Sequence, residues 1–401
     1  MSQKSLLFIT TQLPYPPVSG GIIKTYHLLE FLSKHYKVYF ACPLKKGEAS
    51  HVSKFKEKVN LQESVFKKIN KPRSVNSLIK SYIRSAPLNV YRNYNKELEQ
   101  NIHEYSKKVD LLIVDHYEMG AYVPKKFTGK VILHQHNAEY ILWQSMANTM
   151  FSSLKKTAVL AEVNRIKKSE LAYCRRADMV WAAPNDIEYL KEIGVKNEKL
   201  KQTLHLGNDG LLSLPSLFYR SNNKTILFVG TLTWEANIVG LAWFIKKVFP
   251  LVLQREPKAN LIVVGKTPDQ RLLDVSKDHH NIVFKGFIPN LEEVYLSSSI
   301  AIAPLLFGSG MKVKVLESMY RGIPMVTTKV GIEGIKYLNN QSIGVSNSEK
   351  GFADLCVKLF NDKEVWSSFS TNARRIASKH YQWNQLLKKH HAQIETLLNK
   401  P

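Results

Sequence analysis

A small-residue loop followed by a helix, between positions 308 and 320, has the composition of an anion-binding site. The loop consists of Gly308, Ser309 and Gly310, and the residue pattern predicts a helix over 311–320. The first N–H groups of a helix have no intrahelical partner, and the helix dipole favours negative charge at that end. This loop and helix could therefore hold a phosphate group.

Two lysines and a glutamate on the predicted helix extend that chemistry. Lys312 and Lys314 put positive charge in the first turn, where an ordinary surface helix favours Asp or Glu. Glu317 follows Lys314 by three residues, on roughly the same helix face. A carboxylate there could accept hydrogen bonds from a sugar diol such as a ribose. The alternative is that Lys314 and Glu317 form an ordinary surface ion pair and that the glycines only turn the chain.

A second group of polar residues follows two predicted strands in the first half of the chain. These strands cover residues 109–115 and 130–134, and the residues that follow or end them include His116, His134, His136 and Asn137. Polar side chains at the carboxyl ends of parallel strands face the crevice in which such sheets bind ligands. The group could bind a substrate, or it could consist of satisfied structural residues. Its spacing does not resemble a metal-binding helix motif, and we expect no metal.

Strand and helix signals alternate along both halves of the chain. The predicted strands are 6–10, 37–42, 109–115, 130–134 and 178–182 in the first half, and 226–230, 261–264, 282–284, 300–304 and 325–328 in the second. Such alternation implies right-handed crossovers and parallel sheets. We therefore expect two doubly wound α/β domains.

Three further local predictions concern helices. Gly20 and Gly21 stand between the first strand and the first helix, where adjacent glycines let the backbone approach a ligand or merely turn the chain. A long helical tract is predicted over about 140–176. Asn237 is predicted to cap a helix at 238–248, which carries apolar residues at helical spacing.

Length and composition limit the class of protein. At 401 residues the chain is long enough for two domains, and a hydrophobic content of 44% is typical of a globular protein. No apolar run approaches the ~20 residues needed to cross a bilayer, and residues 6–10 predict a strand rather than a signal peptide. The three cysteines, Cys42, Cys174 and Cys356, have no paired spacing, which favours a reducing compartment and no metal cluster.

The chain is strongly basic. Lys and Arg number 57 against 33 Asp and Glu, which favours an acidic partner or reflects a basic proteome. Residues 54–84 hold nine of the basic residues, opposed by Glu57 and Glu63, and the apolar residues interleaved with them are Phe55, Val59, Leu61, Val65, Phe66 and Ile69. Such a segment predicts an element on an anionic membrane surface or a solvated helix face. Nucleic acid is not expected, because no zinc-finger, helix-turn-helix or RNA-recognition pattern is present.

The segment 300–328, IAIAPLLFGSGMKVKVLESMYRGIPMVTT, resembles the donor site of the family 4 glycosyltransferases (glycosyl transferases group 1), in the branch with a GSGMKxKVLE-type sequence. The resemblance implies that Glu317 holds the ribose of a nucleotide. It also implies that the loop and the helix start, including Met311, hold the donor phosphates. Many relatives carry a further Glu at the place of Ser309, so one contact to the sugar is missing or replaced in this chain.

The resemblance extends to other parts of the second half. The family usually carries Arg and Lys after the first strand of this domain, where this chain has Thr231 and its neighbours. Diphosphate binding would then depend on Lys312, Lys314 and backbone amides. Phe287 matches a loop that touches the nucleobase through its backbone.

In the first half, the resemblance implies that His116 contacts the transferred sugar. His136 and Asn137 match a second strand end, on the acceptor side. Gly20 and Gly21 match a loop that lies against the donor or the acceptor.

The resemblance implies the GT-B fold, in which two Rossmann-like, doubly wound domains face a cleft. We expect an N-terminal acceptor-side domain over 1–210, a linker over 211–223 and a nucleotide-sugar-binding domain over 223–380. A C-terminal helix within 381–401 is expected to pack back on the first domain.

The expected activity is that of a retaining, hexosyltransferase-type glycosyltransferase. It would move a sugar from a nucleotide-diphosphate sugar to a glycan or lipid-linked acceptor in cell-envelope polysaccharide synthesis. No Asp-x-Asp sequence is present, and neither a metal nor another cofactor is expected. The expected location is cytoplasmic, including the inner face of the cytoplasmic membrane.

Three alternatives remain at this point. The first is a non-catalytic GT-B protein that binds a nucleotide sugar or a partner enzyme. The others are another GT-B enzyme, such as a sugar-nucleotide epimerase, and a basic nucleic-acid or lipid-binding protein. Transfer assays against a panel of nucleotide sugars would separate most of them.

Overall fold

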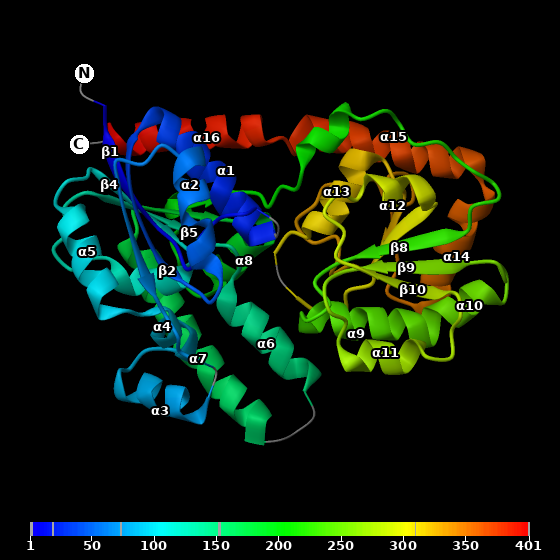
Figure 1. Ribbon diagram of the computed structural model, residues 1–401, viewed down its shortest axis with the longest axis horizontal. Helices are drawn as coiled ribbons and strands as arrows, with labels where there is room; N and C mark the ends of the chain where they lie inside the picture. Colours follow the sequence, from blue (N-terminus) through cyan, green and yellow to red (C-terminus); the bar gives the residue numbers. More distant parts are fainter. Residues whose placement is uncertain (1–2, 18–19, 73, 151–153, 309, 400–401) are drawn as a thin grey trace. The chain divides into compact units, whose positions relative to one another are not determined.

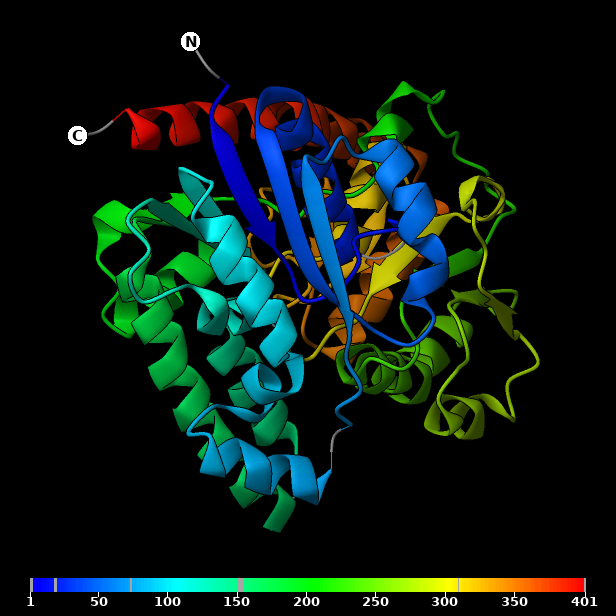
Figure 2. The same cartoon turned by 60° about the vertical axis from the view of Figure 1, so that its left-hand side comes forward.

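The computed structural model describes residues 3–17, 20–72, 74–150, 154–308 and 310–399 (Figures 1 and 2). The chain divides into two compact units. The N-terminal unit comprises Met1–His205 and Trp383–Pro401, and the C-terminal unit comprises Leu206–Gln382. The C-terminal unit is therefore continuous in sequence, whereas the N-terminal unit is built from two separate segments.

The N-terminal unit is built on a seven-stranded parallel sheet. Its strands are β1 (Ser5–Ile9), β2 (Lys37–Leu44), β3 (Glu63–Lys68), β4 (Leu111–Asp115), β5 (Lys130–His134), β6 (Met179–Ala182) and β7 (Leu200–Gln202). Their order in the sheet is β3-β2-β1-β4-β5-β6-β7. The order reverses between β1 and β4, and ligands of such sheets bind outside the carboxyl ends of the strands at that point.

Helices cover both faces of this sheet, which explains why its central strands are continuous apolar runs. The helices are α1 (Gly20–His35), α2 (Val52–Lys58), α3 (Val75–Ile83), α4 (Leu88–Asn93), α5 (Lys96–Ser106), α6 (Glu139–Thr149), α7 (Leu154–Arg176), α8 (Pro184–Glu192) and α16 (Trp383–Leu398). On one face, Leu98 of α5, Ile166 of α7 and Leu190 of α8 join the core. On the other face, Phe55 of α2 packs on Phe40 of β2.

The last helix, α16, completes the N-terminal unit. Its His390 ring stacks on the ring of Trp181 in β6, with centroids 4.2 Å apart. Tyr36 donates a hydrogen bond to Glu395 at 2.7 Å, and Ile394 is fully buried. Residues from the two ends of the chain therefore share one core.

The C-terminal unit has a six-stranded parallel sheet of the same type. Its strands are β8 (Thr225–Val229), β9 (Asn260–Val264), β10 (Ile282–Gly286), β11 (Ile300–Ala303), β12 (Met325–Thr327) and β13 (Ile343–Val345). Their order is β10-β9-β8-β11-β12-β13, so the reversal lies between β8 and β11. Both sheets thus confirm the prediction of two doubly wound, Rossmann-like domains.

The helices of the C-terminal unit are α9 (Glu235–Trp243), α10 (Phe249–Leu253), α11 (Gln270–Ser276), α12 (Glu292–Ser297), α13 (Val313–Arg321), α14 (Glu349–Asn361) and α15 (Lys363–His380). A π-helical segment, Phe244–Val248, joins α9 to α10. The resulting helix, Glu235–Leu253, is the one helix in the described ranges that is long and apolar enough to cross a membrane. Its Leu241 and Phe244 have no exposed area and lie in the core of the unit, as in the central helix of a soluble domain. The sequence showed no apolar run of this length because Lys246 and Lys247 interrupt it.

One of two helix predictions was wrong. The helical tract predicted over 140–176 is present and contains two helices, α6 and α7. Asn237 does not cap α9, because Trp234 occupies the cap position and Asn237 is the third residue of the helix. Its amide Nδ2 instead donates to the carbonyl oxygen of Thr231 at 2.9 Å.

The interpretation of residues 54–84 as one surface element was also wrong. The segment forms α2, β3 and α3. Phe55 and Val59 are 0% and 1% exposed and therefore belong to the core. Lys67 on β3 pairs with Glu97 at 2.8 Å. The strand escaped notice because a half-buried edge strand has no continuous apolar run.

The segment expected as a linker packs on the C-terminal unit. Arg374 donates to the carbonyl oxygens of Leu212 and Leu214 at 2.7 and 3.0 Å. Arg321, which is paired with Glu292 at 2.7 Å, donates to the carbonyl oxygen of Pro215 at 2.8 Å. The backbone of this segment is therefore fixed by arginines of α13 and α15.

Candidate active site

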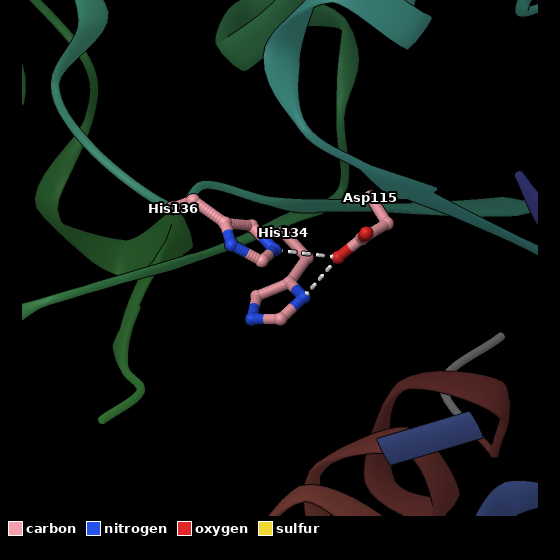
Figure 3. Close-up of side chains that lie close together, drawn as sticks. All are labelled: Asp115, His134 and His136. Atoms are coloured by element: carbon pink, nitrogen blue, oxygen red, sulfur yellow. Dashed lines mark hydrogen bonds and ion pairs between the residues drawn. The ribbon is translucent and has the colours of Figure 1, made fainter. Parts of the chain in front are cut away.

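The N-terminal unit gathers buried polar side chains at the carboxyl ends of β1, β4 and β5. Asp115 ends β4, and its carboxylate is fully buried. Nδ1 of His134 and Nε2 of His136 donate to its Oδ1 at 2.7 and 2.8 Å (Figure 3). The hydroxyls of Thr10 and Thr25 donate to Oδ2, both at 2.7 Å. The parallel register explains the meeting, because Asp115 pairs directly with His134.

These hydrogen bonds fix the charges of the cluster. Burial alone would raise the pKa of Asp115, but the histidines around it hold that pKa well below its usual range. Burial lowers the pKa of His134 and of His136 to about 4. At neutral pH the cluster therefore contains an anionic carboxylate and two neutral imidazoles, each of which donates one N–H to it.

His116 is a partly exposed neighbour of this cluster. Its φ of 73° lies in the left-handed region, which costs a non-glycine residue about 1–3 kcal/mol, and such strained residues tend to cluster at functional sites. Its ring stacks on that of His136, with centroids 3.7 Å apart. Burial lowers the pKa of His116 to about 3, although 23% of the side chain is exposed. A neutral imidazole is thus held at the reversal point of the sheet.

The other residues predicted for this site have supporting positions. Gly20 and Gly21 are the first two residues of α1, and a Cβ on Gly21 would lie 3.4 Å from Nδ1 of His136. His136 itself is buried, with 4% of its side chain exposed, so its contacts are with the cluster. Asn137 is half-buried in the loop between β5 and α6.

Sequence reasoning missed Lys24, a buried cation of the same cluster. Its side chain is 1% exposed, and its Nζ has no hydrogen-bond partner among the described residues. Burial lowers the pKa of Lys24 to about 7, against the attraction of Asp115 and Asp186. The signal was its spacing, because Leu28 and Leu32 follow at intervals of four residues and define the apolar side of α1.

The cluster also has the composition of a metal site. The ligand atoms of Asp115, His134 and His136 lie within 4.8 Å of one another, and two imidazoles with a carboxylate are a common ligand set. In this structure one nitrogen of each ring already donates to Asp115. These hydrogen bonds account for the geometry without an ion, and the absence of a required metal stays a prediction.

In the C-terminal unit, Lys314 brings a partly buried ammonium to the carboxyl end of β8. Its Nζ donates to Oδ1 of Asn237 at 2.7 Å and lies 4.2 Å from the ring centre of Phe228. A Cβ on Gly230 would lie 2.8 Å from this Nζ, so the glycine leaves room for the ammonium. Burial lowers the pKa of Lys314 to about 7, and the charge of Lys312 acts in the same direction.

The ammonium of Lys314 lies at the edge of the sheet where ligands of such folds bind. The strand β8 neighbours β11 at the point where the strand order reverses. It is also the strand end at which the resembled family carries Arg and Lys, and where this chain has the exposed Thr231. In this chain the positive charge at the strand end comes instead from Lys314 of α13, which is distant from β8 in sequence but close to it in the fold.

The glycine loop before α13 is shaped by its backbone and by Lys312. Gly308 and Gly310 have φ angles of 130° and 74°, which L-residues with side chains rarely adopt. Lys312 is the cap residue of α13, is 5% exposed, and donates from Nζ to the carbonyl oxygen of Gly310. Met311 is 6% exposed, and Ser309 lies outside the described residues. Lys312 therefore stabilises the conformation of the loop and also places a positive charge beside it.

Glu317 faces the turn at the start of the C-terminal unit. Its Oε1 accepts a hydrogen bond from the backbone N–H of Asn208 at 3.4 Å. A Cβ on Gly207 would lie 2.5 Å from its Cγ, so the backbone approaches the carboxylate closely. Burial raises the pKa of Glu317. The alternative of a surface ion pair is wrong, because Lys314 donates to Asn237, Glu317 accepts from Asn208, and both side chains are half-buried.

Phe287, which was predicted to lie beside the nucleobase, is on a different loop of the C-terminal unit. It is 59% exposed in the loop that follows β10, after Gly286 with a φ of 69°. The side chain is therefore available at the carboxyl edge of the C-terminal sheet.

Comparisons with known proteins agree with this geometry. Residues 223–362 match the family model described as glycosyl transferases group 1. The chain is 22% identical over 387 residues to an uncharacterized 44.6 kDa protein in the cps region of Klebsiella pneumoniae, an overlap of 94% of this chain and 96% of that protein.

Solved structures with the same architecture cover nearly the whole chain. HepE of Anabaena, in complex with UDP and glucose, has a TM-score of 0.69 and 13% identity over 98% of this chain and 99% of its own. Sucrose-phosphate synthase of Thermosynechococcus elongatus has a TM-score of 0.71 and 14% identity, with the same coverage of 98% and 99%. Residues 223–362 are therefore similar to a group 1 glycosyltransferase domain, and the chain has the GT-B fold.

Proposed function

We propose that the protein is a retaining glycosyltransferase that moves a hexose from a nucleotide-diphosphate sugar to a glycan or lipid-linked acceptor. The observation that carries this proposal is the partly buried ammonium of Lys314 at the reversal point of the C-terminal sheet, on the same helix as Glu317. Negative charge develops on a departing diphosphate. A preorganised cation and helix N–H groups in a buried site stabilise such charge more than water does.

The relatives support the substrate class. HepE has been crystallised with UDP and glucose and, separately, with UDP-glucose. The similar Klebsiella pneumoniae protein belongs to a cps region, which favours a role in cell-envelope polysaccharide synthesis. We infer from this that the donor is a uridine-diphosphate sugar and that the acceptor is a growing or lipid-linked glycan.

The residues suggest how the reaction proceeds. Glu317 would accept hydrogen bonds from the ribose, while Lys314 and the amides of the loop would hold the diphosphate. The neutral imidazole of His116 would hydrogen-bond to the transferred sugar. No carboxylate can be assigned as a nucleophile, so we propose that a phosphate oxygen of the leaving group takes the acceptor proton on the same face of the sugar. The configuration at the anomeric carbon would then be retained.

The test is to incubate the purified protein with a panel of nucleotide sugars and to measure the rate at which the nucleoside diphosphate is released. Lys312→Ala and Lys314→Ala should both lower turnover, one of them severely. Lys329→Ala, an exposed lysine of the same unit, is the matched control. If both test variants stay within about two-fold of the parent, the assignment of the leaving-group site is wrong.

Two further arms of this assay separate the alternatives. A chelator should leave the parent rate nearly unchanged, and complete inhibition would overturn the metal-free mechanism. Tight donor binding without hydrolysis or transfer, with any acceptor fraction, would favour the non-catalytic alternative.

A further inference from the structure

Helix α3 exposes an apolar face to solvent. Four apolar residues of this helix are exposed: Val75 by 74%, Ile79 by 55%, Tyr82 by 49% and Ile83 by 78%. Their spacing puts them along one side of the helix, which we call the α3 face. Ser77 and Ser81 are buried on the other side, at 7% and 0% exposure. The helix therefore packs on the protein through its polar side and exposes its apolar side, the reverse of a helix that packs on a hydrophobic core.

The helix is firmly attached through its serine side. Arg165 of α7 donates to the carbonyl oxygen of Ser81 at 2.9 Å and to its Oγ at 3.2 Å. The same guanidinium lies 3.8 Å from the ring centre of Tyr82. Ser74 caps the helix by accepting a hydrogen bond from the N–H of Ser77 at 3.2 Å. The exposure of the α3 face is thus a property of an anchored helix.

The segment of sequence that contains α3 is basic. Between Glu63 and Glu97 there is no acidic residue, and the eight basic residues are Lys67, Lys68, Lys71, Arg73, Lys80, Arg84, Arg92 and Lys96. The neighbouring α7 begins with Leu154, which is 91% exposed, and the exposed Lys155 follows it. The chain from 140 to 161 also lacks Asp and Glu. Both α3 and the start of α7 lie at the lower end of the N-terminal unit in the two views (Figures 1 and 2).

We propose that the α3 face docks on an anionic lipid surface. A contiguous exposed apolar surface indicates an interaction site. Lysine and acidic residues are depleted in protein–protein interfaces, whereas basic residues beside an apolar helix face are typical of helices that lie in the bilayer interface. The apolar side chains would enter the boundary between headgroups and acyl chains, while Lys80 and Lys155 would meet lipid phosphates. This inference concerns where the protein works and does not rest on its catalytic activity.

The surface differs from the one that the sequence alone suggested. Lys67 is paired with Glu97. Nζ of Lys71 donates to the carbonyl oxygens of Tyr91 and Tyr94. Lys71 therefore has a structural role, and the charge of Lys67 is already paired, so substituting these two lysines would not be a clean test of membrane binding.

The first experiment is vesicle flotation of the full chain with phosphatidylcholine vesicles, with and without phosphatidylglycerol. The parent should float with the anionic vesicles, and added salt should weaken this binding. Ile79→Ser with Ile83→Ser should lower the partition coefficient at least ten-fold, as should Lys80→Gln with Lys155→Gln. The matched control is Leu273→Ser with Lys277→Gln, an exposed pair on and after α11, which should bind like the parent.

A second experiment follows the α3 face directly. The three native cysteines are all buried, so Ile79→Cys supplies a selectively labelled site. An environment-sensitive dye on this cysteine should shift to the blue when anionic vesicles are added, whereas the same dye on Leu273→Cys should not respond. Thermal melting of each variant should match the parent, since the substituted side chains are exposed.

Three results would overturn the proposal. One is equal flotation of the parent and of the Ile79→Ser, Ile83→Ser variant. Another is equal binding to vesicles with and without phosphatidylglycerol. The third is failure of the parent to bind either vesicle while light scattering shows a dimer that the same double substitution dissociates, which would assign the α3 face to a second copy of the chain.

Discussion

At the residue scale, the chemistry proposed for the C-terminal unit depends on the charge of Lys314. Burial lowers its pKa to about 7 in the free protein. In the proposed donor site, a bound diphosphate would bring negative charge close to the ammonium and raise this pKa. Between the free and the bound pKa values, ligand binding must therefore take up a proton. Affinity for UDP should fall as the pH rises from about 7, by up to ten-fold per pH unit.

Calorimetry can count that proton. UDP binding at about pH 8, measured in two buffers of different ionisation enthalpy, should show net proton uptake, and its phosphates are already ionised there because their last pKa is near 6. Lys314→Met should bind UDP more weakly and lose the proton uptake. Unchanged uptake in that variant would assign the titration to another group.

Glu317 supports a second prediction. Glu317→Gln keeps the shape of the side chain but removes its charge, and a hydrogen bond to a charged group contributes roughly 1.5–3 kcal/mol. We expect about ten-fold or greater loss of affinity for a nucleotide sugar, with an unfolding transition close to that of the parent. If calorimetry finds the donor affinity unchanged, Glu317 does not hold the ribose.

Some residues of the candidate site could be predicted from the sequence, and others could not. The glycine loop, Lys314 and Glu317 lie within ten residues, so local spacing was sufficient to group them. The hydrogen bond from Lys314 to Asn237 joins residues 77 apart and could not be inferred from spacing. Lys24 was missed for a similar reason, since its relation to Asp115 exists only through packing of α1 on the sheet.

At the element scale, α9 approaches the end of β11 very closely. A Cβ on Gly240 would lie 2.2 Å from the carbonyl oxygen of Pro304. Gly240→Ala would gain up to about 1 kcal/mol in helix propensity. Overpacking against a backbone carbonyl costs typically 1–3 kcal/mol, so the net change should be destabilising. Urea unfolding should show a lower midpoint for this variant.

A control in the same helix distinguishes packing from propensity. Lys247 is exposed in the π-helical segment, and Lys247→Ala removes no packed group. Its unfolding midpoint should stay close to the parent. A stabilised Gly240→Ala variant would mean that the helix and the loop separate easily at this point.

Elements covered on both faces were predicted well, because burial on both faces leaves a continuous apolar run such as Leu6–Ile9. Elements with mixed surroundings were predicted poorly. β3 at the sheet edge is half-buried and reads as a basic, apolar mixture. α3 has normal amphipathic spacing, and spacing cannot tell which side of a helix meets the protein. Only the buried serines and the exposed isoleucines revealed its orientation.

At the scale of the whole molecule, the N-terminal unit depends on a helix supplied from the far end of the chain. α16 buries Leu386, Leu387, Ile394 and Leu397 to 7% exposure or less. Full burial of each such side chain is worth roughly 1.5–3 kcal/mol, so the sum is comparable to the ~5–15 kcal/mol by which a domain is stable. A chain that ends at Gln382 should therefore lose the folded N-terminal unit and keep the C-terminal one.

Limited proteolysis with mass spectrometry can check this outcome. The truncated chain should yield a protected fragment near residues 206–382, and residues 1–205 should be degraded. A chain that ends at Leu398 keeps the whole of α16 and serves as the control. Protection of residues 1–205 in the shorter chain would show that α16 is dispensable for the fold.

The division of the chain also sets an order of events on the ribosome. The segment Leu206–Gln382 forms a complete unit as soon as it emerges, but the N-terminal sheet must wait for Trp383–Leu398. At roughly 5–20 residues per second, synthesis of the intervening segment takes on the order of ten to thirty seconds. During that time Trp181 and the surface that will receive α16 stay uncovered, and the nascent chain presents a binding site for chaperones that the finished protein no longer has.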